Sequence, residues 1–331
     1  MTTIAAVDRQ AYKEKTGKLC DTVLGRFRRT LRRYALFHTF FLLLAAGEIA
    51  LLLVMLFNFA ESSALALLLA TLFLTAFSYF ALRLYMQAKK PEQLTALRDL
   101  YLRSCQSLLN YQEGIADHHL SLANAACRLA SSLQDEERTL LRPALSKLST
   151  LMHWRDVLMM RELLLLFAID EYLKLVKCQP TTLEIHAALA NAYVMLSCLY
   201  VDNRQEEWLP PGRNSEELCE RFRSTAQRAV EELNILKSFA PNNPWVHQQL
   251  AYSYHDLQMP DEEIKEYEEI LRLQPDNTKT QFKLGIRYFQ QGQNAKGLEI
   301  YESLKSRRYP KADDLMAFYG ATLPTALAFE R

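Results

Sequence analysis

Two long apolar segments near the N-terminus of this 331-residue chain limit the folds that it can adopt. Residues 36–57 include fourteen Leu, Ile, Val or Phe, and residues 64–82 carry no charge. A helix rises 1.5 Å per residue, so about 20 such residues cross a hydrocarbon core about 30 Å thick. Each large apolar residue favours insertion by roughly 0.3 to 0.6 kcal/mol, which outweighs the cost of about 2.5 to 3.5 kcal/mol for the single acid, Glu48. We expect a transmembrane helical hairpin over residues 34–88, with spans at about 36–57 and 64–82.

The basic residues around the two spans predict their orientation. Eight Lys or Arg lie between positions 13 and 33, and Arg83, Lys89 and Lys90 follow the second span. The connector 58–63 contains no Lys or Arg. Short flanks rich in basic residues stay in the cytoplasm. We therefore expect a multi-pass integral membrane protein with two spans, both termini in the cytoplasm and the lipid bilayer as one partner.

The basic leader, residues 1–33, is predicted to be an amphipathic cytoplasmic segment. Leu19, Val23, Phe27 and Leu31 recur every four residues, while arginines occupy other faces. Such a helix can lie on anionic head groups. It can equally extend the first span into the cytosol, and the sequence leaves both possibilities open.

Glu48 is an ionisable residue placed near the middle of the bilayer, where charge is costly and usually has a partner. In a hairpin that turns near Glu61, Thr71 and Thr75 lie at about the same depth. We expect an intramembrane contact among these three residues. The contact is either local hydrogen bonding or an association between helices, which would permit a homo-oligomer.

From residue 92 onward the apolar pattern is helical and repeats. Residues 244–277 align with 278–311 without a gap at a period of 34, which places Leu250-Ala251 over Leu284-Gly285 and Tyr254 over Tyr288. Pro275 closes the first unit. This pattern resembles the tetratricopeptide repeat (TPR). The resemblance implies an all-α fold in which the hairpin precedes a TPR-like α-solenoid of stacked helix pairs.

Weaker copies of the repeat are predicted within residues 140–241. Leu189, Ala190 and Tyr193 match a first helix, and residues 229–241 match a second. Further upstream, Ser146–Trp154 would pair with a second helix that ends near Pro180. We take residues 92–331 as one cytoplasmic TPR-like domain, with a loop insertion at 201–214 and a capping helix at 315–329.

The resemblance also implies a groove that binds a protein or peptide partner, because the first helix of each pair lines the concave face in this family. The groove candidates are Trp245, Gln248, Tyr252, His255, Asp256, Lys279, Phe282, Lys283, Ile286 and Phe289. Aromatic anchors beside a few polar groups are typical of peptide-binding surfaces. Some family members clamp a peptide carboxylate; here Asn191, Lys279 and Lys283 match that pattern, but Ala187 replaces its first Lys.

The sequence does not point to catalysis, metal or nucleic acid. Nucleotide-binding and hydrolase motifs are absent, so we expect no enzyme activity, no cofactor and no metal site. Adjacent His118 and His119 are interpreted as a surface pair, and the acidic run 261–269 as a solvated helix face. Six scattered Cys fit buried, reduced thiols. A net charge of +1 argues against nucleic acid as a partner.

The sequence therefore predicts a membrane-anchored TPR scaffold or adaptor that binds a protein or peptide at the cytoplasmic face. One alternative is a secreted bacterial effector, since the bilobed hydrophobic segment resembles that of chlamydial inclusion-membrane proteins. A second alternative is an accessory subunit of a membrane transport or enzyme complex.

Overall fold

The structure is a computed structural model that describes residues 9–58, 63–110, 115–140, 146–202 and 214–320, and every regular element in these ranges is helical. The chain divides into two compact units, residues 1–174 and 175–331. In chain order the elements are α1 (Arg9–Asn58), α2 (Ser63–Leu109), α3 (Ala116–Leu140), α4 (Ser146–Cys178), α5 (Leu183–Asp202), α6 (Asn214–Phe239), α7 (Pro244–Asp256), α8 (Pro260–Leu273), α9 (Thr278–Gln290), α10 (Asn294–Ser306) and the 3-10 helix η1 (Asp313–Phe318).

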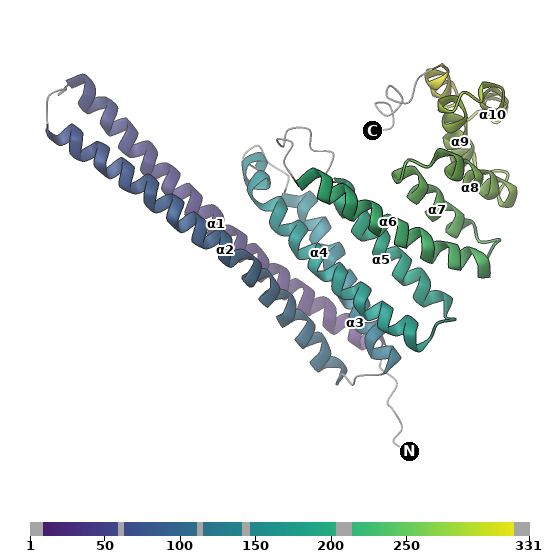
Figure 1. Cartoon of the computed structure of the whole chain (residues 1–331), viewed down its shortest axis with the longest axis horizontal. Coiled ribbons are helices and arrows are strands. Elements are labelled where there is room, and N and C mark those ends of the chain that lie inside the picture. Colours follow the sequence, from purple (N-terminus) through teal and green to yellow (C-terminus); the bar gives the residue numbers. More distant parts are fainter. Residues whose placement is uncertain (1–8, 59–62, 111–114, 141–145, 203–213, 321–331) are drawn as a thin grey trace. The chain divides into compact units, whose positions relative to one another are not determined.

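Helices α1 and α2 run side by side as a long antiparallel pair (Figure 1). Among the described residues, three helices are long and apolar enough to cross a membrane: α1, α2 and α5. No residue in the most apolar stretch of α1 or α2 is buried, whereas 56% of the α5 stretch is. The apolar side chains of α5 are thus used in a protein core, and those of the α1–α2 hairpin are not.

The leader and the first apolar segment form one continuous helix, so the predicted boundary at position 33 falls inside α1. The apolar face of the leader is covered, because Val23 and Phe27 are buried and α1 contacts both α2 and α3. The Cys20 thiol donates to the Ser132 hydroxyl at 3.5 Å. The interpretation that this face lies on head groups is therefore wrong. The predicted boundary near residue 90 also falls within a helix, α2, which continues through Pro91.

Helices α3 and α4 complete the first unit and correct two expectations. His118 and His119 are buried rather than a surface pair, and His119 Nδ1 lies 2.6 Å from Glu171 Oε2 on α4. Ser146–Trp154 is not a separate first helix, since α4 runs from Ser146 to Cys178 without a break. The first unit therefore contains long helices where the sequence predicted a short helix pair.

The cysteines only partly match the expectation of buried thiols. Cys20 and Cys105 are buried, whereas Cys178 and Cys198 are exposed. Burial raises the pKa of Cys105 to about 11, so this thiol stays protonated at neutral pH. It therefore packs as a small apolar group.

The second unit is a TPR-like α-solenoid of helix pairs. Helix α7 begins at Pro244 and α9 at Thr278, 34 residues later; α8 begins at Pro260 and α10 at Asn294, the same spacing. Each apolar cluster joins one pair to the element that follows it. The clusters are Ala190, Leu233, Leu236, Val246 and Leu250; then Ala251, Ile264, Tyr267, Ile270, Leu284 and Tyr288; then Ile286, Phe289, Leu304, Ala312, Leu315 and Phe318. This shared burial between neighbours is what makes a solenoid stable.

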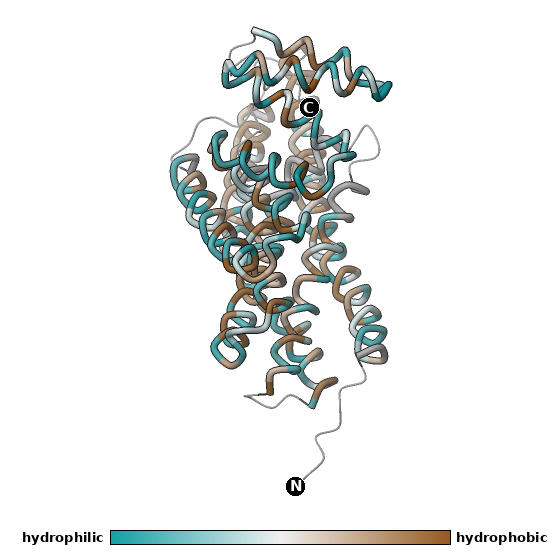
Figure 2. The backbone as a smooth tube through the Cα atoms, turned by 90° about the vertical axis from the view of Figure 1, so that its right-hand side faces the viewer, coloured by the Kyte–Doolittle hydropathy of each residue, from teal (hydrophilic) through white to brown (hydrophobic). Residues whose placement is uncertain are grey.

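Figure 2 shows hydrophilic and hydrophobic residues alternating along many of the helical turns. Such alternation is expected of helices that bury one face and expose the other. In the solenoid the buried faces form the clusters between pairs.

Two glycines allow the last pair to pack closely. A Cβ at Gly297 would lie 2.5 Å from Cε1 of Phe289, and a Cβ at Gly285 would lie 2.8 Å from Cδ2 of Leu315. The Phe289 ring therefore occupies the space that a methyl group at position 297 would need.

The end of the solenoid differs from the predicted capping helix at 315–329. The chain forms the 3-10 helix η1, which buries Leu315 and Phe318 against α9 and α10. The rest of that prediction, like most of the predicted 201–214 insertion, lies outside the described residues.

Candidate functional site

Helices α7 and α9, the first helices of the two clearest repeats, present the candidate groove. Each begins at an asparagine cap: Asn243 Oδ1 accepts from the Trp245 backbone N–H at 3.0 Å, and Asn277 Oδ1 accepts from the Thr280 N–H at 3.1 Å. Pro244 occupies the first position of α7, where its missing N–H costs nothing. The equivalent caps start both helices in the same register.

A polar cluster joins α7 to α9. Gln248 Nε2 donates to the Tyr252 hydroxyl at 2.7 Å. Lys283 Nζ donates to the same hydroxyl at 3.4 Å and lies 4.4 Å from the centre of the Tyr252 ring. Burial alone would raise the pKa of Tyr252, but the Gln248 hydrogen bond and the Lys283 charge outweigh it and lower the pKa. The cluster thus offers hydrogen-bond donors and a positive charge beside an aromatic face.

Other groove candidates surround this cluster. Trp245 is 41% exposed and precedes Gln248 by one helical turn. Lys279 is exposed and stands one turn before Lys283 on α9. Phe282 is half-buried, with its ring centre 5.9 Å from that of Tyr309. We name as the open face these six residues: Trp245, Gln248, Tyr252, Lys279, Phe282 and Lys283.

The remaining groove candidates do not belong to the open face. Ile286 and Phe289 are buried in the cluster beneath η1, so the prediction that they line the groove is wrong. His255 contacts Arg287 and lies 3.4 Å from Glu263, so it belongs to a link between α7, α8 and α9. Asp256 is half-buried beside it in the chain.

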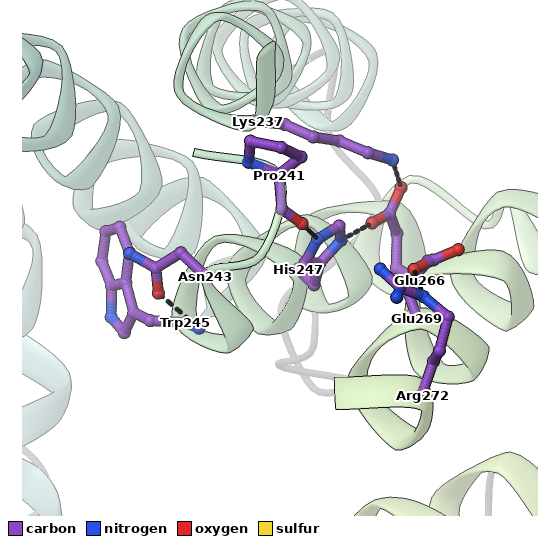
Figure 3. A network of polar contacts seen from close by, with 8 residues as sticks. All are labelled: Lys237, Pro241, Asn243, Trp245, His247, Glu266, Glu269 and Arg272. Atoms are coloured by element: carbon purple, nitrogen blue, oxygen red, sulfur yellow. Dashed lines mark hydrogen bonds and ion pairs between the residues drawn. The ribbon is translucent and has the colours of Figure 1, made fainter. Parts of the chain in front are cut away.

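A buried ionic contact fixes α7 against α6 and α8 (Figure 3). His247 Nε2 lies 2.7 Å from the Pro241 carbonyl oxygen, and His247 Nδ1 lies 2.6 Å from Glu266 Oε2. Lys237, near the end of α6, donates to Glu266 Oε1 at 2.6 Å. A carbonyl can only accept, so the Nε2 atom of His247 carries a proton. The contact orients the helix that carries Trp245, Gln248 and Tyr252.

The same arrangement occurs in the preceding pair. His186 Nε2 lies 2.9 Å from the Pro180 carbonyl oxygen, and its Nδ1 lies 2.7 Å from Glu232 Oε2. In the following pair, Gln281 Nε2 donates to the Pro275 carbonyl at 3.0 Å. In all three cases the donor stands six residues after a proline. We call this arrangement the proline latch: a His or Gln that donates to the carbonyl of the proline six residues earlier.

The acidic partners of the histidines also share a position. Glu171, Glu232 and Glu266 each stand nine residues before the proline that follows their helix, and each contacts a histidine of the helix before it. This spacing is a sequence signal that could have located the contacts. Composition alone could not, because acidic residues in a helix are most often solvated.

The acidic run 261–269 is therefore only partly a solvated face. Glu263 and Glu266 are buried, with 2% and 4% of their surface exposed. Glu263 Oε1 accepts from Arg287 Nε at 2.8 Å, which links α8 to α9. Each buried carboxylate is thus paired with a cation or histidine, as a buried charge must be.

Within the hairpin, Thr75 and Glu48 are brought together and Thr71 is not. The Thr75 hydroxyl donates to Glu48 Oε1 at 2.8 Å, whereas the Thr71 hydroxyl donates to the Leu68 carbonyl in its own helix. Within the described residues, Glu48 Oε2 is buried and has no hydrogen-bond partner. This polar contact between α1 and α2 thus helps to fix the register of the two helices.

The part of the chain that the structure describes contains no group of three or more His, Cys, Asp or Glu side chains placed to hold a metal ion. In the contacts of His186 and His247 with glutamate, both ring nitrogens lie within hydrogen-bond distance of other groups of the protein. Their geometry is that of structural contacts between helices.

No protein-family model matches the chain, and no curated protein matches it. Similar solved structures include MamA from AMB-1, 17% identical, with 75% of this chain and 97% of MamA covered and a TM-score of 0.39. A thermophilic TPR protein of Thermus thermophilus, TTC0263, is 18% identical over 76% of this chain and 96% of its own, with a TM-score of 0.34. YrrB, a TPR protein with an unusual peptide-binding site, is 13% identical over 60% and 97%, with a TM-score of 0.24. At these scores, the fold assignment rests on the helix pairs of the chain itself.

Proposed function

We propose that the protein is a membrane-anchored scaffold or adaptor whose α-solenoid binds a protein or peptide partner at the cytoplasmic face. The observation that carries the proposal is the contrast in burial along one chain. No residue in the apolar stretches of α1 and α2 is buried, whereas the apolar residues of the solenoid form clusters between helix pairs.

The exposure of the hairpin supports membrane insertion. Phe57, Phe73 and Leu67 are 84%, 76% and 70% exposed. Soluble proteins rarely expose a contiguous apolar surface of this extent. A lipid environment removes the free-energy cost of exposing this apolar surface to water. The two antiparallel helices satisfy their backbone hydrogen bonds internally, as a membrane requires.

The basic flanks support a cytoplasmic location for both units. Most of the positive charge near the spans lies in the leader and after Leu82, and the positive-inside rule places such basic flanks in the cytoplasm. Anchoring would confine the open face to the membrane surface. Partners held at the same surface then meet it at a raised effective concentration, so weak contacts are sufficient.

The open face supports a peptide as the bound element. Trp245 and Tyr252 offer rigid aromatic surface, and Lys279 and Lys283 offer charge beside it. This combination favours a short segment with an apolar anchor and an anionic or carbonyl group.

Membrane anchoring is tested on native membranes. Alkaline carbonate washing is expected to leave the full chain in the pellet. In vesicles sealed with the cytoplasmic face inward, external protease is expected to leave the solenoid intact. Extraction by carbonate, or digestion of residues 175–331 in such vesicles, would contradict the proposal.

Partner binding is tested with a photo-crosslinking amino acid placed at Trp245. A crosslinked species is expected in membranes and is expected to be lost when Tyr252 and Lys283 are replaced by alanine. The matched control is the crosslinker at Phe239, which is 60% exposed but belongs to α6, the second helix of its pair. Equal crosslinking at both positions would argue against a partner specific to the open face.

A further inference from the structure

A groove lies between α1 and α2 in the first unit, outside the hairpin's apolar stretch and separate from the open face. Its volume is about 570 Å³. The lining residues are Lys15, Lys18, Leu19 and Thr22 of α1 and Leu100, Arg103, Ser104, Ser107 and Leu108 of α2. We name it the basic groove.

The floor of the basic groove is apolar. Leu100 and Leu108 are 41% and 40% exposed, and Ser104 lies between them on the same face of α2. Across the groove, Leu19 is half-buried on α1. Residues spaced by four and eight positions form one stripe along a helix, the pattern that receives another helix.

The rim of the groove is positively charged. Lys15 and Lys18 stand on the α1 side and Arg103 on the α2 side, and all three are exposed. Within the described residues, Lys15 and Arg103 form no ion pair, and Lys18 pairs with Glu14 at 3.0 Å, both side chains being strongly exposed. The lining residues include three cations and no acid, and two of these cations, Lys15 and Arg103, have no ion-pair partner among the described residues.

We propose that the basic groove binds an amphipathic α-helix of a partner protein, with apolar residues against Leu19, Leu100 and Leu108 and acidic residues facing Lys15, Lys18 and Arg103. The positive rim favours a partner helix with acidic residues along its sides. The apolar floor favours a stripe of large apolar side chains on the same helix. Leu108 stands eight positions after Leu100 on α2, so the groove is about 12 Å long at the helical rise. A partner helix of two to three turns covers it.

Distance from the membrane favours a protein over a lipid head group. Thr22 precedes the first span at Leu36 by 14 residues, which corresponds to about 21 Å along the continuous helix α1. Leu100 follows the second span at Leu82 by 18 residues, or about 27 Å along α2. Head groups of the bilayer that anchors the hairpin do not reach that far. This step alone rests on the proposed anchoring.

The test uses the full-length chain in lipid nanodiscs and a fluorescent 14-residue helical peptide as the probe. The peptide carries Leu at every third or fourth position and Glu beside this stripe; a second peptide has Lys in place of Glu. Fluorescence anisotropy is expected to show binding of the acidic peptide only. The triple variant K15E/K18E/R103E is expected to weaken that binding by about tenfold or more and to acquire binding of the basic peptide.

A second variant, L100A/L108A, keeps the charges and removes apolar area, so it is also expected to weaken binding of the acidic peptide. Both variants change exposed side chains, and circular dichroism verifies that the helices remain. The proposal is overturned if the wild type binds neither peptide, if the triple variant binds the acidic peptide unchanged, or if anionic vesicles compete fully with the peptide. Because the measurement does not use the open face, a loss of peptide binding leaves the proposed function standing; failure of the chain to enter nanodiscs would instead count against the proposed anchor.

Discussion

The hairpin exposes most of its large apolar side chains, whereas the solenoid buries them. In the hairpin, Leu43 and Phe73 are 65% and 76% exposed, and Glu48 and Thr75 meet in the seam between the helices. In the solenoid, Glu263 and Glu266 are almost fully buried, while apolar residues fill the spaces between pairs. Both regions are helical, so secondary structure does not explain the difference.

The proposed membrane anchor accounts for the difference by two surroundings and two ways of joining helices. Lipid accepts apolar side chains, so a hairpin in a membrane gains little by burying them and relies on packing and a few polar contacts. In water, helix pairs associate by burying apolar area. A buried charge is then tolerated only when paired, as Glu266 is with His247 and Lys237.

The largest effect is expected from two charges in the hairpin, Leu43→Arg together with Phe73→Arg. Each arginine near the centre of a span costs about 2.5 to 3.5 kcal/mol of insertion free energy. Most of the chain should then move from the carbonate-washed pellet to the supernatant. Leu84→Arg is the matched control, because Leu84 is 67% exposed but lies beyond the second span. If the double variant stays in the pellet as the control does, the hairpin is not held by lipid.

In the solenoid the largest effect is expected from Glu266→Leu. The substitution leaves His247 and Lys237 without their carboxylate, and removal of one partner of a buried pair costs about 3 to 5 kcal/mol. The free energy of unfolding is measured by urea denaturation of the detergent-solubilised chain, followed by tryptophan fluorescence.

His247→Gln is the informative companion variant. Gln281 makes the equivalent contact to the Pro275 carbonyl in the next pair, so a glutamine at 247 should keep the proline latch and cost only about 1 kcal/mol. Equal losses in the free energy of unfolding for Glu266→Leu and His247→Gln would show that the contact of His247 with the carboxylate, rather than the proline latch, stabilises this part of the solenoid.

The sequence predicts the large features well because they depend on local periodicity. The apolar lengths around Glu48 and the 34-residue spacing from Leu250 to Leu284 are visible without any tertiary information. The side of a helix that faces a neighbour is less visible. The run 261–269 is mostly acidic, and only packing against α7 and α9 decides that Glu263 and Glu266 turn inward.

The candidate groove was predicted only in part for the same reason. Trp245, Gln248 and Tyr252 follow helical spacing and lie on one face of α7. Ile286 and Phe289 follow similar spacing on α9, but η1 covers them, and no local pattern predicts where the chain returns after α10. Helix periodicity therefore identifies a face, and tertiary packing decides whether that face stays open.

A smaller effect with an informative sign is expected from Gly297→Ala. Alanine normally stabilises a helix over glycine by about 1 kcal/mol. Here its methyl group would overlap the Phe289 ring, so we expect a net loss of about 1 to 3 kcal/mol. The same urea titration checks this, and Phe289→Leu in the alanine background should recover part of the loss.

Gly25→Ala is the matched control for that variant. Gly25 is also helical, and a Cβ added there would have no atom within 4 Å of it. This substitution should stabilise α1 by about 0.4 to 1 kcal/mol. A stabilising Gly297→Ala would mean that the last helix pair is packed more loosely than its contacts indicate.

The smallest effect is expected from the titration of His186. Burial lowers the pKa of this imidazole, but hydrogen bonds to the Glu232 carboxylate and the Pro180 carbonyl outweigh it, so the folded-state pKa lies above the ordinary value of 6.5. The protonated form is therefore favoured by folding. Its contribution is fully present below pH 6.5 and is lost as the pH rises through the folded-state pKa.

The measurement compares Tm with His186→Gln between about pH 5.5 and 8.5, the range in which histidine titrates. Glutamine can still donate to the Pro180 carbonyl but does not titrate, so the difference in Tm between wild type and variant should shrink as the pH rises. A difference that stays constant across the range would assign the contribution of His186 to the latch alone. The pair α5–α6 would then be held in the same way as Gln281 holds the start of α9, by a neutral hydrogen bond to the proline before it.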